Sequence, residues 1–218
     1  KDTLSKVILE NMTRSFLLIL FSLFACSDSG SKNISDESII QDLEWNEVWS
    51  DEFDGESLDE NKWNILQWRP GWVNNELQAY TNRDTNVFLN NGNLVLQGLI
   101  EPGYYGTDHT GTGYNADYTS GRVNTDDNIN WTYGRFDIRA KLPKGRGSWP
   151  AIWMLGENIS TVGWPNCGEI DIMEHVGFEE GMIHGSIHTE DYNHSINTQR
   201  SGAKFVSTAT DSFHTYSL

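Results

Sequence analysis

From Glu44 onward, short runs of alternating apolar and polar residues recur between clusters of turn-forming residues. This period of two is typical of half-buried strands, because successive side chains on a strand point to opposite faces. The pattern predicts strands at 47–50, 93–98, 133–142, 151–154 and 183–189, with a hairpin turn at Asn91-Gly92. The sequence shows no strong long amphipathic helix, internal repeat or phosphate-binding glycine loop. We therefore expect an all-β fold, most economically a sandwich of two curved antiparallel sheets.

The predicted strand from Gly168 to Glu174 carries three acidic residues within an apolar run. Alternation places Glu169 and Asp171 on one face and the isoleucines between and after them on the other. Simple alternation would send Glu174 to the apolar face. One extra residue bulging out near Met173 would restore the phase, and such bulges are common beside active sites. With the bulge, all three carboxyl groups share one face.

Three carboxyl groups this close cannot all ionise readily, so at least one should keep its proton at neutral pH while another is anionic. Glycoside hydrolysis requires such an acid beside such a nucleophile. We assign Glu169 as the nucleophile, Glu174 as the general acid and then base, and Asp171 as the group that tunes their protonation. A solvated acidic strand edge, or a divalent-cation site made of carboxylates, is also compatible with these residues alone.

Three tryptophans flank the acidic strand in the sequence, Trp149, Trp153 and Trp164. A tryptophan offers a flat apolar face and one hydrogen-bond donor, which suits stacking on sugar rings. Core packing is the alternative for each one singly, but we expect at least one to line the site. Downstream, His188 could orient Glu174 if its strand neighbours the acidic strand, or it could be a hydrogen-bonded structural histidine.

Other nucleophilic or metal chemistry has little support in the sequence. The remaining histidines in the second half of the chain lack metal-ligand spacing, so a zinc enzyme is not expected. Cys167 has no convincing base nearby and is expected to be a buried thiol. Its context differs completely from that of Cys26, so we expect no structural disulfide between them.

The composition narrows the class of partner. A chain of 218 residues with 37% hydrophobic residues suits one globular domain. A formal net charge of -16 would repel the phosphate backbone of a nucleic acid, so a neutral polymer fits better. Nine tryptophans and eight tyrosines also suit a sugar-stacking surface.

The sequence of the N-terminal region indicates a targeting segment and not a part of the folded domain. Residues 16–25 form an apolar run after Arg14, too short for a span of about 20 residues. The run is typical of a secretory signal, and its ending resembles a bacterial lipobox with Cys26 as the lipidated residue; a buried core helix is the alternative. We expect residues 1–26 to be an upstream segment and signal peptide with a start at Met12, and the serine-rich residues 27–43 to be a flexible tether. The protein would then be extracytoplasmic, touching a bacterial membrane or cell surface only through its lipid.

The segment from Gly168 to Glu174 resembles the Glu-x-Asp-x-x-Glu signature of glycoside hydrolase family 16, in the bulged form typical of laminarinases. The segments 49–55, 72–78, 118–122, 133–136 and 149–151 resemble further family segments in the expected order. The resemblance implies a concanavalin A-like β-jelly-roll over residues 44–218. It also implies retaining hydrolysis of β-1,3-glucan or mixed-linkage β-glucan, with the two catalytic carboxyl groups about 5 to 5.5 Å apart. An algal galactan (agar or carrageenan) as substrate, or a non-catalytic carbohydrate-binding sandwich, are the alternatives.

By the same resemblance, substrate contacts are expected from Asn75, Arg122 and the three tryptophans, and a structural calcium from the regions of Glu52 and Gly92. No cofactor is expected to be required for catalysis, and we expect a monomer. The resemblance further implies strands beyond Leu218, so we expect a domain incomplete at its C-terminus. This chain alone would then fold poorly, because strand edges would be unpaired.

Overall fold

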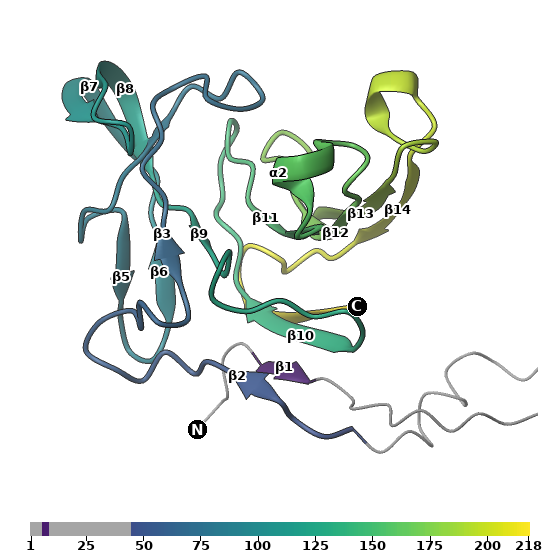
Figure 1. Ribbon diagram of the computed structural model, residues 1–218. Coiled ribbons are helices and arrows are strands. Elements are labelled where there is room, and N and C mark those ends of the chain that lie inside the picture. Colours follow the sequence, from purple (N-terminus) through teal and green to yellow (C-terminus); the bar gives the residue numbers. More distant parts are fainter. Residues whose placement is uncertain (1–5, 9–44) are drawn as a thin grey trace, which may run out of the picture.

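The computed structural model describes residues 6–8 and 45–218 (Figure 1). The predicted signal peptide, the lipidated Cys26 and the tether at 27–43 lie outside the described residues, apart from the short strand at 6–8, and they stay predictions. Within the described ranges, no helix has the length and apolar character needed to cross a membrane.

Strands dominate the described chain, as predicted. They are β1 (Lys6–Ile8), β2 (Trp49–Ser50), β3 (Asn64–Ile65), β4 (Ala79–Tyr80), β5 (Val87–Leu89), β6 (Leu94–Leu96), β7 (Leu99–Thr107), β8 (Gly113–Ser120), β9 (Val123–Asn124), β10 (Arg135–Ala140), β11 (Ala151–Leu155), β12 (Glu169–Glu174), β13 (Met182–His188), β14 (Arg200–Phe205) and β15 (His214–Ser217). The helical elements are short: α2 (Ile159–Val162) and the 3-10 turn η1 (His194–Ile196).

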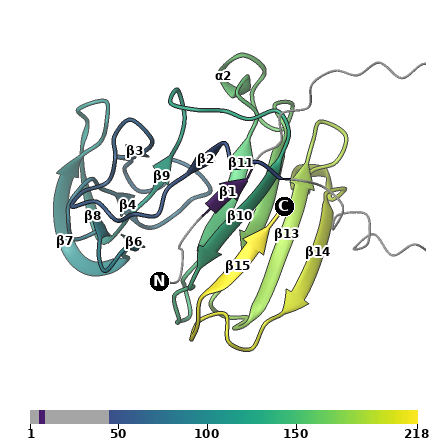
Figure 2. The ribbon, with the colours of Figure 1, turned by 90° about the horizontal axis from the view of Figure 1, so that it is seen from below.

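Two antiparallel sheets form a sandwich. One has the strand order β15-β10-β1-β2 and the other β11-β12-β13-β14, and β10 lies beneath the second sheet in Figure 1. Figure 2 shows β10 and β15 side by side, with β13 and β14 paired in the other layer. Buried side chains of both layers form a common core: Leu142, Met173, Ile183, Ala209 and Tyr216. The predicted sandwich is confirmed.

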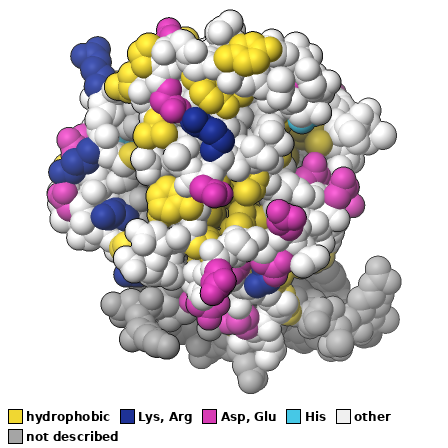
Figure 3. All heavy atoms as spheres, turned by 90° about the vertical axis from the view of Figure 1, so that its left-hand side faces the viewer, with side chains coloured by type: hydrophobic (Ala, Val, Ile, Leu, Met, Phe, Trp, Pro, Cys, Tyr) yellow, Lys and Arg dark blue, Asp and Glu magenta, His cyan; other side chains and the backbone are white. Residues whose placement is uncertain are grey.

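The strands β3 to β9 form a second group beside the sandwich (Figure 1). The β7–β8 hairpin is antiparallel, but β4 joins β8 in parallel, which the antiparallel prediction did not include. The β5–β6 hairpin turns at Asn91 and Gly92, both with positive φ, as this hairpin type requires. Figure 3 views the molecule from this side and shows hydrophobic side chains exposed in several patches with acidic side chains between them.

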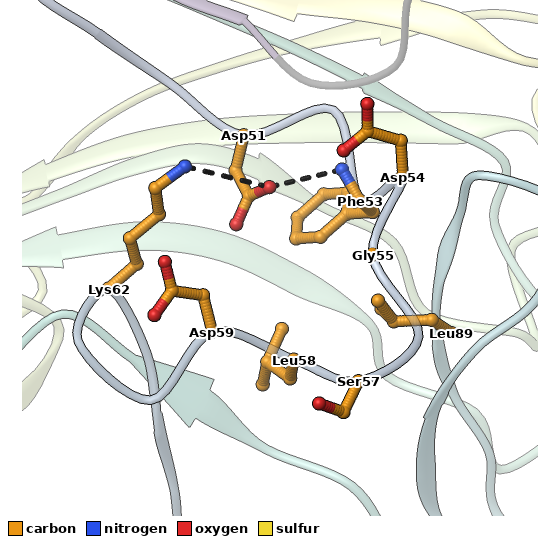
Figure 4. A pocket seen from close by; sticks show the side chains of 9 residues that line it. All are labelled: Asp51, Phe53, Asp54, Gly55, Ser57, Leu58, Asp59, Lys62 and Leu89. Atoms are coloured by element: carbon orange, nitrogen blue, oxygen red, sulfur yellow. Dashed lines mark hydrogen bonds and ion pairs between the residues drawn. The ribbon is translucent and has the colours of Figure 1, made fainter.

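A pocket lies where the segment after β2 meets β5 (Figure 4). Asp51 anchors one wall: it accepts hydrogen bonds from the backbone N–H of Phe53 (3.0 Å) and from Nε1 of Trp63 (2.8 Å). The wall includes Leu89, so the segment that carries Glu52 approaches the hairpin that carries Gly92. In the described part of the chain, the acidic, histidine and cysteine side chains grouped closely enough to hold a metal do not include Glu52. The side chains here therefore do not make a calcium site by themselves, and calcium stays a prediction.

Candidate active site

Strand β12 contains a bulge at the position that the sequence predicts. Against β11, Trp153 pairs with Asp171 while its neighbour Ile152 pairs with Met173, so Ile172 is the extra residue. The pairing with β13 shifts in the same interval. Met173 is 1% exposed in the sandwich core, and Ile172 packs against the same cluster. Two consecutive residues therefore face inward, and the phase of the strand is reset before Glu174.

Because of the bulge, Glu174 shares the electrostatic environment of Glu169 and Asp171. Asp171 is 5% exposed. Burial, the charge of Glu169 and then that of Glu174, with a hydrogen bond to Glu169, raise the pKa of Asp171 to about 8. The expectation that one of the three carboxyl groups holds its proton is met by Asp171. Asp171 lies between the other two acids, and its protonated carboxyl group donates a hydrogen bond to the Glu169 carboxylate.

Trp149 contacts the third carboxyl group directly. Its Nε1 donates a hydrogen bond to Oε1 of Glu174 at 3.0 Å, while the side chain stays 51% exposed. The indole therefore fixes one oxygen of Glu174 and leaves a broad apolar surface beside it. This is the arrangement expected of a tryptophan that both orients an acid and offers a stacking face.

His188 does not lie where we expected it. Its Nε2 is 3.2 Å from Oδ2 of Asp171 and 4.0 Å from Oε1 of Glu169. In the β12–β13 register, His188 is opposite Glu169, and the bulge brings His184 opposite Glu174. The expectation that His188 orients Glu174 is therefore wrong, because the register fixes it at the other end of the acidic strand.

Arg122 joins the second group of strands to the sandwich. Its guanidinium lies 4.9 Å from the ring centroid of Trp153, 4.4 Å from that of Trp68 and 5.6 Å from that of Tyr80. Burial and a hydrogen bond with Glu76 raise the pKa of Tyr80 to about 12, so its hydroxyl stays protonated. The cation is held among three aromatic faces, and one of them belongs to a predicted sugar-contacting tryptophan.

The comparisons with known proteins agree with this geometry. Residues 74–218 match the model of glycosyl hydrolases family 16. The chain belongs to this family. It is 44% identical over 214 residues to a β-glucanase of Rhodothermus marinus, covering 96% of this chain and 70% of that protein.

Solved structures of family 16 members share the fold. The laminarinase of R. marinus is 45% identical, with a TM-score of 0.68 over 78% of this chain and 65% of that one. The laminarinase catalytic domain of Thermotoga maritima is 40% identical, with a TM-score of 0.70 over 80% of this chain and 70% of that one. The chain thus spans somewhat less than two thirds of the solved R. marinus laminarinase.

The remaining predicted contacts of this family 16 chain differ in their surroundings. The ring of Trp164 stacks on His194 with a centroid distance of 4.6 Å and lies 6.0 Å from His188. Asn75 is exposed in a turn with a positive φ of 55°, and no contact in the described part of the chain joins it to the carboxylates. Sequence reasoning missed His194, which is brought in by the β13–β14 connection. The only signal was its position six residues after His188.

Replacing Asp171 by asparagine should change how stability depends on pH. The raised pKa means that the folded state binds more protons than the unfolded state between about pH 3.8 and about 8, so this group makes stability fall as the pH rises through that window. Asparagine keeps the shape of the side chain but cannot ionise. The free energy of unfolding of the variant should therefore fall less than that of the wild type as the pH rises. Urea unfolding midpoints across the window, with the exposed Asp126→Asn as a matched control, would measure it. Parallel curves for the wild type and Asp171→Asn would contradict the assignment.

Proposed function

We propose that the protein is a retaining endo-glycosidase that hydrolyses β-1,3-glucan or mixed-linkage β-glucan. The observation that carries the proposal is the bulge in β12, which brings Glu174 to the face of Glu169 and Asp171. A binding module has no need of three clustered carboxyl groups, since their repulsion costs stability. Double displacement needs an anion and an acid on either side of one bond.

In the first step, Glu169 attacks the anomeric carbon while Glu174 protonates the departing glycosidic oxygen, leaving a covalent glycosyl ester on Glu169. In the second step, Glu174 takes a proton from water, which attacks the anomeric carbon; the bond to Glu169 breaks, and this second inversion restores the starting configuration. Asp171 stays protonated between them and so avoids a third negative charge beside the nucleophile. Its hydrogen bond to Glu169 stabilises the carboxylate that is consumed in the first step and released in the second.

The surroundings of the three acids suit a sugar chain. Trp149 holds one oxygen of Glu174 and leaves half of its own surface exposed. Trp153 and Trp164 supply further aromatic faces near β12, backed by Arg122 and His194 respectively. Aromatic faces fixed by a cation or a stacked ring lose little entropy when they pack on a sugar.

The substrate class rests on charge and on the relatives. A net charge of -16 favours a neutral glucan over a sulfated galactan, and the similar proteins described above are a β-glucanase and laminarinases.

Incubation of the purified protein with laminarin, lichenan, agarose and κ-carrageenan should release reducing ends from laminarin, lichenan or both, and none from the galactans. Early NMR spectra should show the β-anomer of the product. Hydrolysis of a galactan alone would identify a galactanase, an initial α-anomer would contradict retention, and binding without hydrolysis would indicate a carbohydrate-binding protein.

A further inference from the structure

Glu169, Asp171 and His188 place three metal-ligating atoms in one small space. One ligand atom from each lies within 4.8 Å of the other two. Nε2 of His188 is 3.2 Å from Oδ2 of Asp171 and 4.0 Å from Oε1 of Glu169. Asp171 and His188 are each 5% exposed, so two of these three side chains are almost completely withdrawn from water.

Two polar atoms of this group lack a hydrogen-bond partner. Oδ2 of Asp171 and Nδ1 of His188 are buried and have no hydrogen-bond partner among the described residues. Although Oδ2 lies near Nε2 of His188, the two do not form a hydrogen bond with acceptable geometry. A buried acceptor without a partner is costly. Oδ2 of Asp171 is such an acceptor, and it lies 3.2 Å from Nε2 of His188.

A metal ion held by Nε2 of His188 would satisfy the buried Oδ2 of Asp171 with little rearrangement. Zn²⁺ binds carboxylate oxygen and imidazole nitrogen at about 2.0 to 2.2 Å, which separates neighbouring ligand atoms in a tetrahedral site by about 3.3 to 3.5 Å. The observed 3.2 Å between Oδ2 and Nε2 is close to this value. The 4.0 Å to Glu169 requires only a modest rotation of that side chain, which is 18% exposed.

We propose that Glu169, Asp171 and His188 bind one divalent transition-metal cation of the Zn²⁺ type, and that this ion blocks hydrolysis by occupying the nucleophile. The ion would displace the proton of Asp171, and an imidazole with two carboxylates suits Zn²⁺, whereas Ca²⁺ and Mg²⁺ prefer sites made wholly of oxygen with more ligands. Because Nδ1 of His188 lacks the second hydrogen bond that usually orients a metal-binding histidine, binding should be weaker than in structural zinc sites. Only the inhibitory consequence depends on the proposed function.

Calorimetric titration with ZnCl₂ at neutral pH tests the binding without any assay of activity. We expect the wild type to bind one ion. Both His188→Ala and the nearly isosteric Glu169→Gln should bind it about tenfold or more weakly, and millimolar Ca²⁺ or Mg²⁺ should not displace it. Thermal melts establish whether each variant is folded. If His188→Ala does not fold, the Zn²⁺ affinity of Glu169→Gln alone tests the proposal.

The matched control is His184→Ala. His184 is on the same strand as His188, and its Nε2 lies 3.2 Å from Oε2 of Glu179, a more exposed histidine–carboxylate pair that has no third ligand among the described residues. His184→Ala should bind Zn²⁺ like the wild type, and binding that is lost there but kept in Glu169→Gln would overturn the proposal. So would the absence of Zn²⁺ binding at millimolar concentration.

A second measurement addresses inhibition. Zn²⁺ should inhibit hydrolysis of laminarin by the wild type and by His184→Ala, and EDTA should restore it. Zn²⁺ that binds at this site without lowering the rate would overturn the inhibitory part. A protein that binds Zn²⁺ but hydrolyses no polysaccharide would instead count against the proposed function, so the two failures are distinguishable.

Discussion

Glu169→Ala is expected to lower the rate of glucan hydrolysis by about 10⁴-fold or more, because no other group could form the covalent intermediate. This loss corresponds to about 5 kcal/mol of transition-state stabilisation. The fold should survive, because Glu169 is not among the residues of the sandwich core and its removal relieves charge repulsion on Asp171. Reducing-end assays with laminarin, together with thermal melts, would measure both effects.

Sodium azide gives this experiment its specificity. In Glu169→Ala, azide can enter the space left by the carboxylate and attack the anomeric carbon of an activated aryl glycoside, producing the α-glycosyl azide by a single inversion. The exposed Glu157→Ala serves as the matched control and should keep the wild-type rate. A folded Glu169→Ala variant that retains most of its activity, or that forms the β-azide, would show that Glu169 is not the nucleophile.

Much of the fold and the core of the site follow from local patterns. The strands at β6, β10, β11 and β13 lie within a residue or two of the predicted limits, because each is a short run with apolar, strand-favouring residues between turn segments. The bulge could be predicted because three acids cannot share a strand with inward-facing isoleucines unless the phase shifts once. The positions of the three acidic residues in the sequence were therefore enough to predict the bulge in the backbone.

Contacts made by distant segments could not be predicted in this way. Nothing in the sequence around β4 indicates that it pairs in parallel with β8, because that pairing depends on the path of the intervening chain. The ring of His194 reaches Trp164 through the β13–β14 connection, which is about thirty residues away from Trp164 in the sequence. The position of His188 depended on the register of β12 and β13, which pairs it with Glu169 and keeps it close to Asp171, while the shift after Asp171 changes only the partner of Glu174.

The same register explains how the three acids can be given different roles. Asp171 lies between its neighbours and is the most buried of the three, so its proton is the hardest to remove. Glu174, beyond the bulge, is held by the indole of Trp149 instead of by another carboxylate. The bulge therefore both gathers the acids and separates the environment of Glu174 from that of the other two.

Glu174→Ala is expected to reduce laminarin hydrolysis by about 10²- to 10⁴-fold, the range typical of losing a general acid–base. The effect should depend on the leaving group. A glucose leaving group needs protonation, whereas a dinitrophenolate departs without it, so formation of the glycosyl-enzyme from a dinitrophenyl glycoside should be little affected. Hydrolysis of that intermediate should remain slow, because no base activates the water. Rapid-mixing measurements should therefore show a burst of dinitrophenol followed by a slow steady state.

Azide separates this variant from Glu169→Ala by stereochemistry. In Glu174→Ala, azide needs no general base and attacks the glycosyl ester on Glu169, so two inversions give the β-glycosyl azide. Glu179→Ala, which removes a nearby exposed carboxylate paired with His184, is the matched control and should show neither the burst nor azide product. Equal losses on laminarin and on the dinitrophenyl glycoside, with no burst, would contradict the role of Glu174 as the acid. That result would also leave the bulge in β12 without a catalytic purpose, because the face on which Glu174 lies would then not matter for the reaction.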